Sequence, residues 1–337
     1  MYTSIYAQDI PALLKQLAAT PEMMRLSDVG MNCGCEYADI TVYRNSKFQY
    51  TRLIHSIGVA NIIWHFTKDI RQSVAGLLHD IATPVFAHTI DFMNNDHMTQ
   101  ESTEAKTRSV IEDSKEIMLI LENNGIGIDD VCDYHMYPIA DNNSPLLSAD
   151  RLEYTLGSGH ILYHESLSQI KAIYDDLHVA VNEHDTLELC FKSARTAKKF
   201  VEITLRNSRL FVSNEDRFLM QYLAEIMRDA INIGTLTLND LYKTESEVIT
   251  ILKKCPKLSL KWDSFTNISA VATADKKLPG TYSTKVYAKK RYINPLVITQ
   301  EGVKRIAEID AGLKAEIEAF LSLDFNDWLY VIHVNLI

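Results

Sequence analysis

The sequence predicts a mainly α-helical fold, with an all-helical core and a small C-terminal α+β subdomain. Apolar residues recur at helical spacing through most of the first 240 residues. The chain of 337 residues is 47% hydrophobic and has only 12 Gly and 8 Pro, which is typical of a packed globule with few long loops. After Gly234, short β-branched or alternating segments replace the helical pattern.

The helical part divides into two blocks. From Pro11 to about Tyr163, short polar breaks separate helices, with Asn94–Asp96 ending one and Asn123–Gly125 another. We assign 1–165 to a compact core. The length of the chain, which exceeds that of a typical single domain, favours further units after this core.

The second block, 166–240, is predicted to be a helical extension that completes a pocket on the core. Its segments Ala197–Leu210 and Arg217–Ile231 have helical apolar spacing, and Glu183–Asp185 is interpreted as a turn between helices. The remaining residues, 241–337, are assigned to the α+β subdomain. Its predicted strands are Glu247–Leu252, Ile268–Ala272, Ser283–Ala288 and Trp328–Ile337, and its predicted helix is Thr299–Leu321.

Composition limits the functional classes. The net charge is −10, from 34 basic and 44 acidic residues, which argues against general nucleic-acid binding and requires a local basic pocket for any anion. The five cysteines, Cys33 and Cys35 among them, are an odd number and suit free thiols in a reducing compartment. The N-terminal MYTSIYAQDI lacks a signal-peptide pattern, and no window approaches the roughly 18 apolar residues of a membrane span. We therefore expect a cytoplasmic protein that contacts no membrane.

Four residues suggest metal chemistry. His55 and the dipeptide His79-Asp80 fall in segments with helical apolar spacing, so two packed helices can bring both imidazoles together. Asp150 stands among apolar residues in SPLLSADRLEYTLGSG, where a buried carboxylate needs a positive partner. Two imidazoles and two carboxylates suit a divalent ion such as Mn, Fe, Co, Ni or Zn, with Mg also open.

Spacing alone leaves other interpretations open. A single histidine on a helix is more often a satisfied core side chain than a metal ligand, and Asp150 next to Arg151 can form a surface ion pair. The segments TRLIHSIGVA, HDIATPVFAH and SADRLEY, however, resemble those of the HD-domain superfamily of metal-dependent phosphohydrolases, and most closely its dNTP triphosphohydrolase-like branch. The likeness begins near an Arg-containing segment at Arg25. It implies an HD-domain core whose metal ligands are His55, His79, Asp80 and Asp150.

The resemblance also implies roles for residues around the metal. Arg52 lies one helical turn before His55, so its guanidinium can reach a metal-bound phosphate. The expected substrate contacts are Arg52, Arg151, Tyr154 and Arg206. The expected acid–base and supporting groups are His88, Asp91 and Glu101.

The sequence also departs from the dNTP branch. Thr83 and Gln100 stand where the branch has catalytic histidines, and Ser158 where it has an aspartate that reads the sugar 3′-hydroxyl. Loss of two general acids would slow the reaction by about two to four orders of magnitude. The four predicted metal ligands are thus all present, while several residues specific to the dNTP branch are missing.

The leading hypothesis is a metal-dependent phosphohydrolase in which metal-activated water attacks a nucleotide or similar small phosphate ester. Its alternatives are a degenerate HD module that binds nucleotide or metal in a regulatory role, and a di-iron oxygenase, for which His97, His135 and His160 are available as extra ligands. The basic run Lys285–Arg291 can bind a regulatory anion at a subunit boundary or form the solvated face of a strand. A homo-oligomer is implied by the resemblance only.

Overall fold

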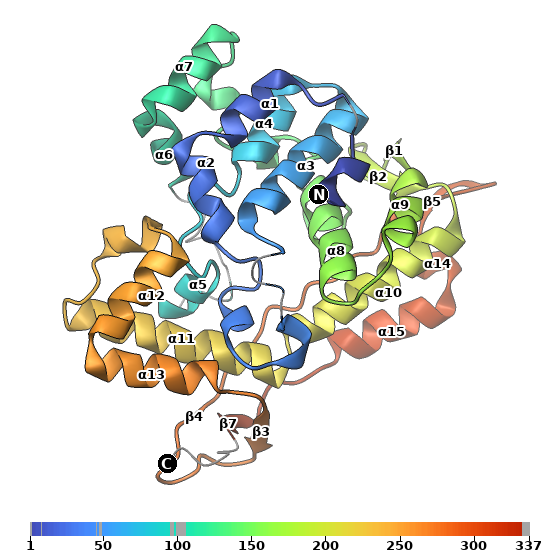
Figure 1. Cartoon of the computed structure of the whole chain (residues 1–337). Helices are drawn as coiled ribbons and strands as arrows, with labels where there is room; N and C mark the ends of the chain where they lie inside the picture. The colour runs from blue at the N-terminus through green and yellow to red at the C-terminus, as the bar shows by residue number, and fades with distance from the viewer. Residues whose placement is uncertain are drawn as a thin grey trace.

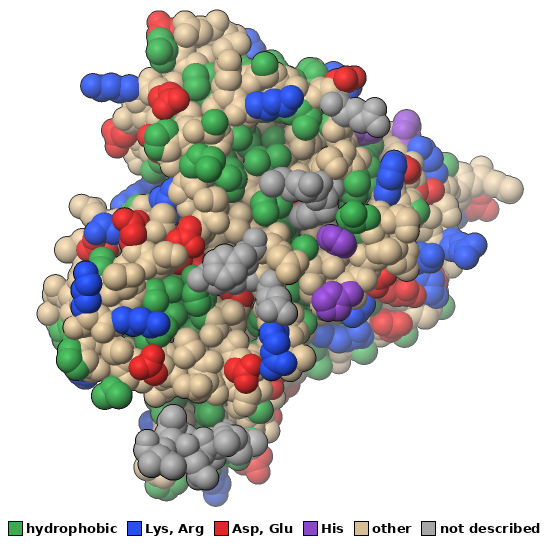
Figure 2. All heavy atoms as spheres, in the orientation of Figure 1, with side chains coloured by type: hydrophobic (Ala, Val, Ile, Leu, Met, Phe, Trp, Pro, Cys, Tyr) green, Lys and Arg blue, Asp and Glu red, His purple; other side chains and the backbone are tan. Residues whose placement is uncertain are grey.

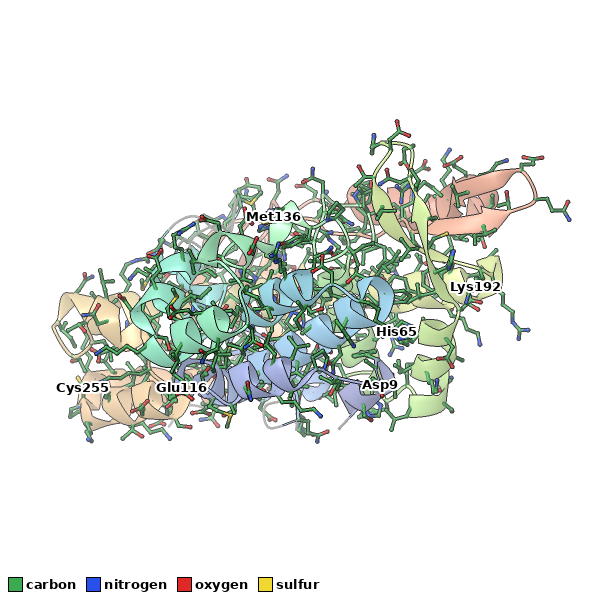
Figure 3. The ribbon with its side chains drawn as sticks, turned by 90° about the horizontal axis from the view of Figure 1, so that it is seen from above. Asp9, His65, Glu116, Met136, Lys192 and Cys255 are labelled. Atoms are coloured by element: carbon green, nitrogen blue, oxygen red, sulfur yellow. The ribbon has the colours of Figure 1, made fainter. Side chains whose placement is uncertain are left out.

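The computed structural model describes residues 2–7, 9–44, 46, 49–94, 98 and 106–331. Figure 1 shows a mainly helical molecule in which small sheets lie at the right-hand and lower edges. Seen from above, the α12–α13 region around Cys255 and the residues that follow β2, around Lys192, lie at opposite ends (Figure 3). No helix in the described part is long and apolar enough to cross a membrane.

Three helices build the centre of the core, and each begins at a capping side chain. The backbone N–H of Ile54 donates to Thr51 at the start of α3 (Arg52–Thr67). Asp69 caps α4 (Ile70–Leu78) in the same way. Ser148 caps α8 (Ala149–Ile161). Helix α3 packs against both α4 and α8, and this packing brings the first turns of α3 and α8 close to the end of α4.

The remaining elements of the first 165 residues are short helices. The predicted breaks are confirmed, because one helix ends at Met93 before Asn94 and another ends at Asn123. The α-helices are α1 (Ala12–Ala18), α2 (Pro21–Arg25), α5 (Thr89–Met93), α6 (Thr107–Asp113) and α7 (Lys115–Asn123). The single-turn 3₁₀ helices are Tyr2–Ile5, Leu26–Asp28, Cys35–Tyr37, Thr41–Tyr43, Ile128–Asp130 and Tyr134–Met136.

The second block contains the predicted long helices and an unpredicted hairpin. The predicted helices correspond to α10 (Ala194–Phe211) and α11 (Asn214–Asn232), which follow α9 (Leu167–Asp175). The interpretation of Glu183–Asp185 as a turn between helices is wrong. These residues connect the antiparallel strands β1 (Leu177–Val181) and β2 (Leu187–Phe191), in which Val179 pairs with Leu189.

The hairpin joins the C-terminal region in one sheet. Its strand order is β1-β2-β5-β6, with β5 (Leu296–Thr299) parallel to β2 and β6 (Gly302–Arg305) antiparallel to β5. The second sheet, ordered β3-β7-β4, lies at the bottom of Figure 1. Its strands are β3 (Val271–Ala274), β4 (Ser283–Thr284) and β7 (Trp328–Val331). Strand pairing therefore crosses the predicted boundary at residue 240, and the division into domains stays a prediction.

The predicted strand Glu247–Leu252 is wrong, because these residues lie in α12 (Glu245–Lys254). The β-branched residues there suggested a strand, but a capping box between Thr244 and Glu247 starts a helix. Val248 and Leu252 are one helical turn apart and both are buried, as a helix requires. The 3₁₀ helix Leu238–Tyr242 precedes α12, and α13 (Pro256–Thr266) follows it.

The predicted helix Thr299–Leu321 begins too early. Gly302, which follows the turn after β5 and begins β6, adopts φ 109°, a conformation that favours glycine. The helical part is divided into α14 (Ile306–Ile309) and α15 (Ala311–Leu321), the second of which is capped by Asp310.

The apolar residues form two core clusters. The first includes Ile81 and Ala82 and extends through the N-terminal helices to α10 and α15. The second includes Val85 and Phe86 and extends through α11, α12 and α13. The backbone N–H of Val85 also donates to the carbonyl of Leu241. The short segment after α4 thus contributes side chains to both core clusters. Packing against the two clusters holds this segment in place.

Candidate metal centre

His55 and His79 face each other across α3 and α4. His55 lies in the first turn of α3, and His79 is the residue that ends α4. Each Nδ1 is engaged by the protein, with His55 Nδ1 2.6 Å from Glu153 Oε2 and His79 Nδ1 2.8 Å from the carbonyl of Gly76. Such contacts fix the ring orientation of metal-binding histidines. Both Nε2 atoms therefore point to the same place, and the ring centroids are 5.2 Å apart.

The two predicted carboxylates approach these Nε2 atoms. Asp80 Oδ2 lies 3.5 Å from His79 Nε2 and 3.9 Å from His55 Nε2. Asp150 Oδ1, from the first turn of α8, lies 3.0 Å from His55 Nε2 and 3.8 Å from His79 Nε2. All four residues chosen from the sequence thus converge.

This donor set fits a divalent cation. His55, His79 and Asp80 are buried and offer ligand atoms within 4.8 Å of one another. Among the described residues, this is the group of at least three potential metal-binding side chains that meets that distance. Asp150, with 21% of its side chain exposed, would complete a set of two imidazoles and two carboxylates.

The electrostatics of the cluster point the same way. Burial by itself would raise the pKa of Asp80 and of Asp150, but nearby positive groups outweigh it and hold both values well below the usual range. Burial would likewise lower the pKa of His55, but its hydrogen bonds to Asp150 and Glu153 raise it to about 10. The site therefore concentrates negative charge that a proton on His55 partly neutralises, and a divalent cation would neutralise it further.

Asp80 is held by Arg52 and Thr83. Arg52 Nη1 donates to both carboxylate oxygens, at 3.2 and 3.1 Å, and its side chain is only 10% exposed. Thr83 Oγ1 donates to Asp80 Oδ1 at 2.7 Å. Arg25 in turn donates to the carbonyls of Ile81 and Thr83 and so fixes the turn that carries Asp80.

Glu153 was missed by the sequence reasoning. Its side chain is fully buried, and it accepts a hydrogen bond from the Tyr50 hydroxyl at 2.8 Å as well as contacting His55. A Cβ on Gly58 would lie 2.6 to 2.8 Å from Glu153 atoms, so only glycine leaves room for this side chain. The available signal was an acidic residue one helical turn after Asp150, between the buried Leu152 and Leu156.

His88 and Asp91, which follow the His79-Asp80 dipeptide along the chain, form a pair of their own. His88 Nδ1 lies 2.8 Å from Asp91 Oδ2, and the Asp91 side chain is fully buried. Burial lowers the pKa of His88, with a further contribution from the positive charges of Arg291 and Arg52. Glu101, the third predicted acid–base residue, lies outside the described residues, as do Gln100 and His97.

The other predicted substrate residues have mixed surroundings. Arg151 donates to Asn142 Oδ1 at 2.7 Å and lies 3.2 Å from Asp141 Oδ1. Tyr154 is largely buried, which raises its pKa to about 12, and its aromatic contact is with Phe211.

Arg206 is directed elsewhere by its contacts. Its side chain is 49% exposed and pairs with Glu165 at 3.4 Å, and its guanidinium stacks on Tyr163 at 3.9 Å. Neither of these contacts joins Arg206 to the metal cluster, so its role as a substrate contact stays a prediction.

Comparison with known proteins finds relatives of this chain, one of which is named as a phosphohydrolase. No protein-family model matches the chain. The chain is 27% identical over 252 residues to the uncharacterized protein YdhJ of Bacillus subtilis, with 74% of each protein covered. It is 25% identical over 224 residues to the metal-dependent phosphohydrolase cns2 of Cordyceps militaris. That alignment covers 63% of this chain and 58% of the Cordyceps protein.

Solved structures share this chain's fold. A hypothetical protein from Aquifex aeolicus superposes with a TM-score of 0.63 at 18% identity, covering 96% of this chain and 93% of that protein. A phosphohydrolase from Bacteroides thetaiotaomicron superposes with a TM-score of 0.64 at 17% identity, covering 96% and 97%. The mainly α-helical fold predicted from the sequence is confirmed, and the buried His-His-Asp cluster supports a divalent metal.

Proposed function

We propose that this protein is an HD-type metal-dependent phosphohydrolase that acts on a small phosphate ester. The observation that carries the proposal is the convergence of His55, His79, Asp80 and Asp150 from separate helices and turns, with both Nδ1 atoms occupied. The name of the Cordyceps relative supports the same class of reaction.

The four ligands would hold the ion, and Arg52 would orient one of them. When bound, a divalent ion supplies a Lewis acid that polarises a phosphoryl oxygen and lowers the pKa of a coordinated water. Arg52 and Thr83 fix both oxygens of Asp80, so this carboxylate keeps one orientation. Glu153 and the Gly76 carbonyl do the same for the imidazoles.

Proton transfer is assigned to His88. Because the Asp91 carboxylate only accepts hydrogen bonds, the shared proton belongs on His88 Nδ1, and Nε2 is left to accept a proton from the attacking water. Burial lowers the pKa of His88, which favours the neutral ring that a general base requires. Asp91 acts here as a positioning residue.

The substrate class proposed is a nucleotide or a similar ester. This choice rests on the resemblance of the three sequence segments to the dNTP triphosphohydrolase-like branch, with Arg52, Arg151 and Tyr154 as the proposed contacts. Thr83 and Ser158 argue for a substrate other than a dNTP, because the branch has a histidine and an aspartate at these positions.

A screen for phosphate release tests the proposal. The full chain, loaded separately with Mn, Fe, Co, Ni, Zn or Mg, is incubated with dNTPs, NTPs, nucleoside monophosphates and cyclic dinucleotides. We expect turnover of at least one ester that is lost in Asp150→Asn and kept in Asp175→Asn, which alters an exposed carboxylate paired with Lys171. Turnover that survives in Asp150→Asn contradicts the proposal.

One observation favours a second candidate, a regulatory module that binds nucleotide or metal without hydrolysing it. Position 83 is a threonine and offers no imidazole to a phosphate. Its hydroxyl is already engaged, because it donates to Asp80. A protein that binds nucleotide only in the presence of metal, and that releases no phosphate in the screen, would have this function.

A further inference from the structure

A buried ion pair links the C-terminal region to the β1–β2 hairpin. Arg305, the last residue of β6, donates to both carboxylate oxygens of Glu188 in β2, at 2.6 and 2.8 Å. Glu188 is fully buried, and Arg305 is only 7% exposed. Figure 2 shows that the surface at the right of the molecule carries exposed side chains of both charges, and such exposed pairs contribute little to stability. A buried pair must offset a large desolvation cost, and one use of such a pair is to fix a single geometry.

Glu188 also holds the segment that leads into α8. The backbone N–H of Leu147 donates to Glu188 Oε1 at 2.9 Å, from 41 residues earlier in the chain. Asn182 Nδ2 donates to the other oxygen at 3.0 Å. Each carboxylate oxygen therefore has one donor from Arg305 and one from elsewhere, and these four contacts hold the carboxylate in one orientation toward Leu147.

Arg305 reaches the same segment by a second route. Its Nη1 also donates to the carbonyl of Asn294 at 3.1 Å. The backbone N–H of Asn294 donates in turn to the carbonyl of Pro145 at 2.9 Å. One guanidinium group thus supports the loop before α8 at two points, Pro145 and Leu147.

The residues after Leu147 carry this constraint to the metal centre. Ser148 caps α8 by accepting a hydrogen bond from the backbone N–H of Arg151 at 3.2 Å. Asp150 lies in the first turn of this helix, three residues after Leu147. A shift of Leu147 would therefore move the Asp150 carboxylate, which lies 3.0 Å from His55 Nε2.

Asp150 needs this support more than the other proposed ligands do. Those three are each oriented by a direct contact from a residue that is not itself a ligand. In the described part of the chain, the Asp150 carboxylate contacts His55 and His79, which are proposed ligands themselves. The direction of the Asp150 side chain is therefore set largely by the backbone at the start of α8.

We propose that Glu188 and Arg305 are positioning residues for Asp150, which hold its carboxylate in the metal centre through the backbone of Leu147. This inference rests on the proposed function and deepens it. It makes the sheet that joins the hairpin to the C-terminal region part of the support of a metal ligand.

Metal affinity, measured on folded protein, separates positioning from stability. The full chain and its variants are titrated with Mn in competition with a fluorescent chelator, and the visible spectrum of the Co-loaded forms reports the ligand geometry. Melting temperatures of the metal-free forms show which variants are folded. In the double variant Glu188→Met/Arg305→Met, apolar side chains of similar length replace both members of the pair, so neither is left as an unpaired buried charge.

Glu183→Met is the matched control. Glu183 accepts hydrogen bonds from the same Arg305 guanidinium, at 3.0 and 2.8 Å, but its side chain is 49% exposed. The Leu147 N–H donates to Glu188, so the control removes a partner of Arg305 and keeps the contact with the loop.

We expect the double variant to bind Mn about tenfold more weakly, at the low end of the cost of losing a ligand-orienting residue, because this pair acts through the backbone. Its Co spectrum should differ from that of the wild type. Glu183→Met should match the wild type in both measurements. Arg305→Lys, which keeps the charge and loses the planar fork, should weaken Mn binding by a smaller factor, and it carries the test if the double variant does not fold.

The outcomes separate this inference from the proposed function. Wild-type Mn affinity in the folded double variant would overturn the inference, as would an equal loss of affinity in Glu183→Met. If the double variant does not fold, wild-type affinity in Arg305→Lys would overturn it. Ester turnover by the wild type would leave the proposed function standing in each of these cases.

The reverse result is also distinguishable. Mn affinity that depends on the Glu188–Arg305 pair, in a chain that hydrolyses no ester of the screen, would uphold the inference and contradict the proposed hydrolysis. A wild type that binds no metal would overturn both.

Discussion

Two groups of buried carboxylates in this protein have opposite electrostatic surroundings. In the candidate metal centre, Asp80 contacts Arg52 and lies near both histidines, and its pKa is held well below the usual range despite burial. Between α11, α12 and the 3₁₀ helices that follow α2, the buried Asp216 and Glu245 contact neutral donors.

The neutral donors do not offset burial. Asp216 accepts from the Tyr43 hydroxyl at 2.5 Å, and burial raises its pKa to about 7. Glu245 accepts from the backbone N–H groups of Gly30 and Phe86, and burial together with Glu36 raises its pKa to about 8. Burial alone therefore does not indicate function, and the distinguishing feature of the site is charge that the fold keeps ionised.

The largest effect is expected at His88, the proposed proton-transfer residue. His88→Ala should lower kcat by about 10²- to 10⁴-fold, because the proposed general base is lost. Bound metal should stay at the wild-type amount, and His184→Ala, an exposed histidine in the β1–β2 turn, should leave kcat unchanged. Loss of metal in His88→Ala would show that His88 supports the ligands instead.

The next effect concerns stability. Arg52→Met leaves Asp80 buried without its guanidinium, and breaking such a pair costs about 3–5 kcal/mol. Urea unfolding in the presence of a chelator should measure this loss, and added Mn should recover part of it, because metal binds the folded state. Arg44→Met breaks the exposed pair with Asp39 and should cost less than about 1 kcal/mol. Equal losses in both variants would contradict the dependence of the buried Asp80 on its guanidinium partner.

A smaller effect is expected at Glu153. Glu153→Gln keeps the shape of the side chain but weakens the contact that orients His55, so metal affinity should fall by about 10- to 100-fold. Competition with a fluorescent chelator measures the affinity. Glu122→Gln, at an exposed position near the end of α7, is the control. Unchanged affinity in Glu153→Gln would limit Glu153 to a packing role.

The smallest effect is the pH dependence of stability that Glu245 should cause. Because the pKa of Glu245 rises from 4.5 when unfolded to about 8 when folded, the folded state binds more protons between these values. The free energy of unfolding should therefore fall as pH rises through this window, by at most about 1.4 kcal/mol per pH unit for one group. Glu245→Gln should remove this component, whereas Glu247→Gln, on the exposed face of α12, should keep it. A Glu245→Gln profile parallel to that of the wild type would contradict the raised pKa.

Local sequence patterns and motifs were enough to predict the long helices and the four candidate metal ligands. Helical periodicity located α10 and α11, and the order of the three motif segments selected His55, His79, Asp80 and Asp150. These residues lie on or beside helices whose caps are visible in the sequence, so their convergence needed only the packing of α3, α4 and α8.

Contacts between distant segments could not be predicted in the same way. The β1–β2 hairpin is paired with β5, more than 100 residues later. The wrong strand at α12 has a different cause, because its β-branched residues outweighed a capping box that is local to the sequence. Glu153 contacts His55 only because Gly58 leaves room for it.

The most direct test of the metal centre is elemental analysis of the purified chain. The wild type, Asp80→Ala and the surface control Asp175→Asn are prepared with Mn or Fe present, and bound metal per chain is measured after removal of free ions. We predict at least one ion per chain in the wild type and in Asp175→Asn, and its loss in Asp80→Ala. A metal-free wild type, or undiminished metal in Asp80→Ala, would contradict the site.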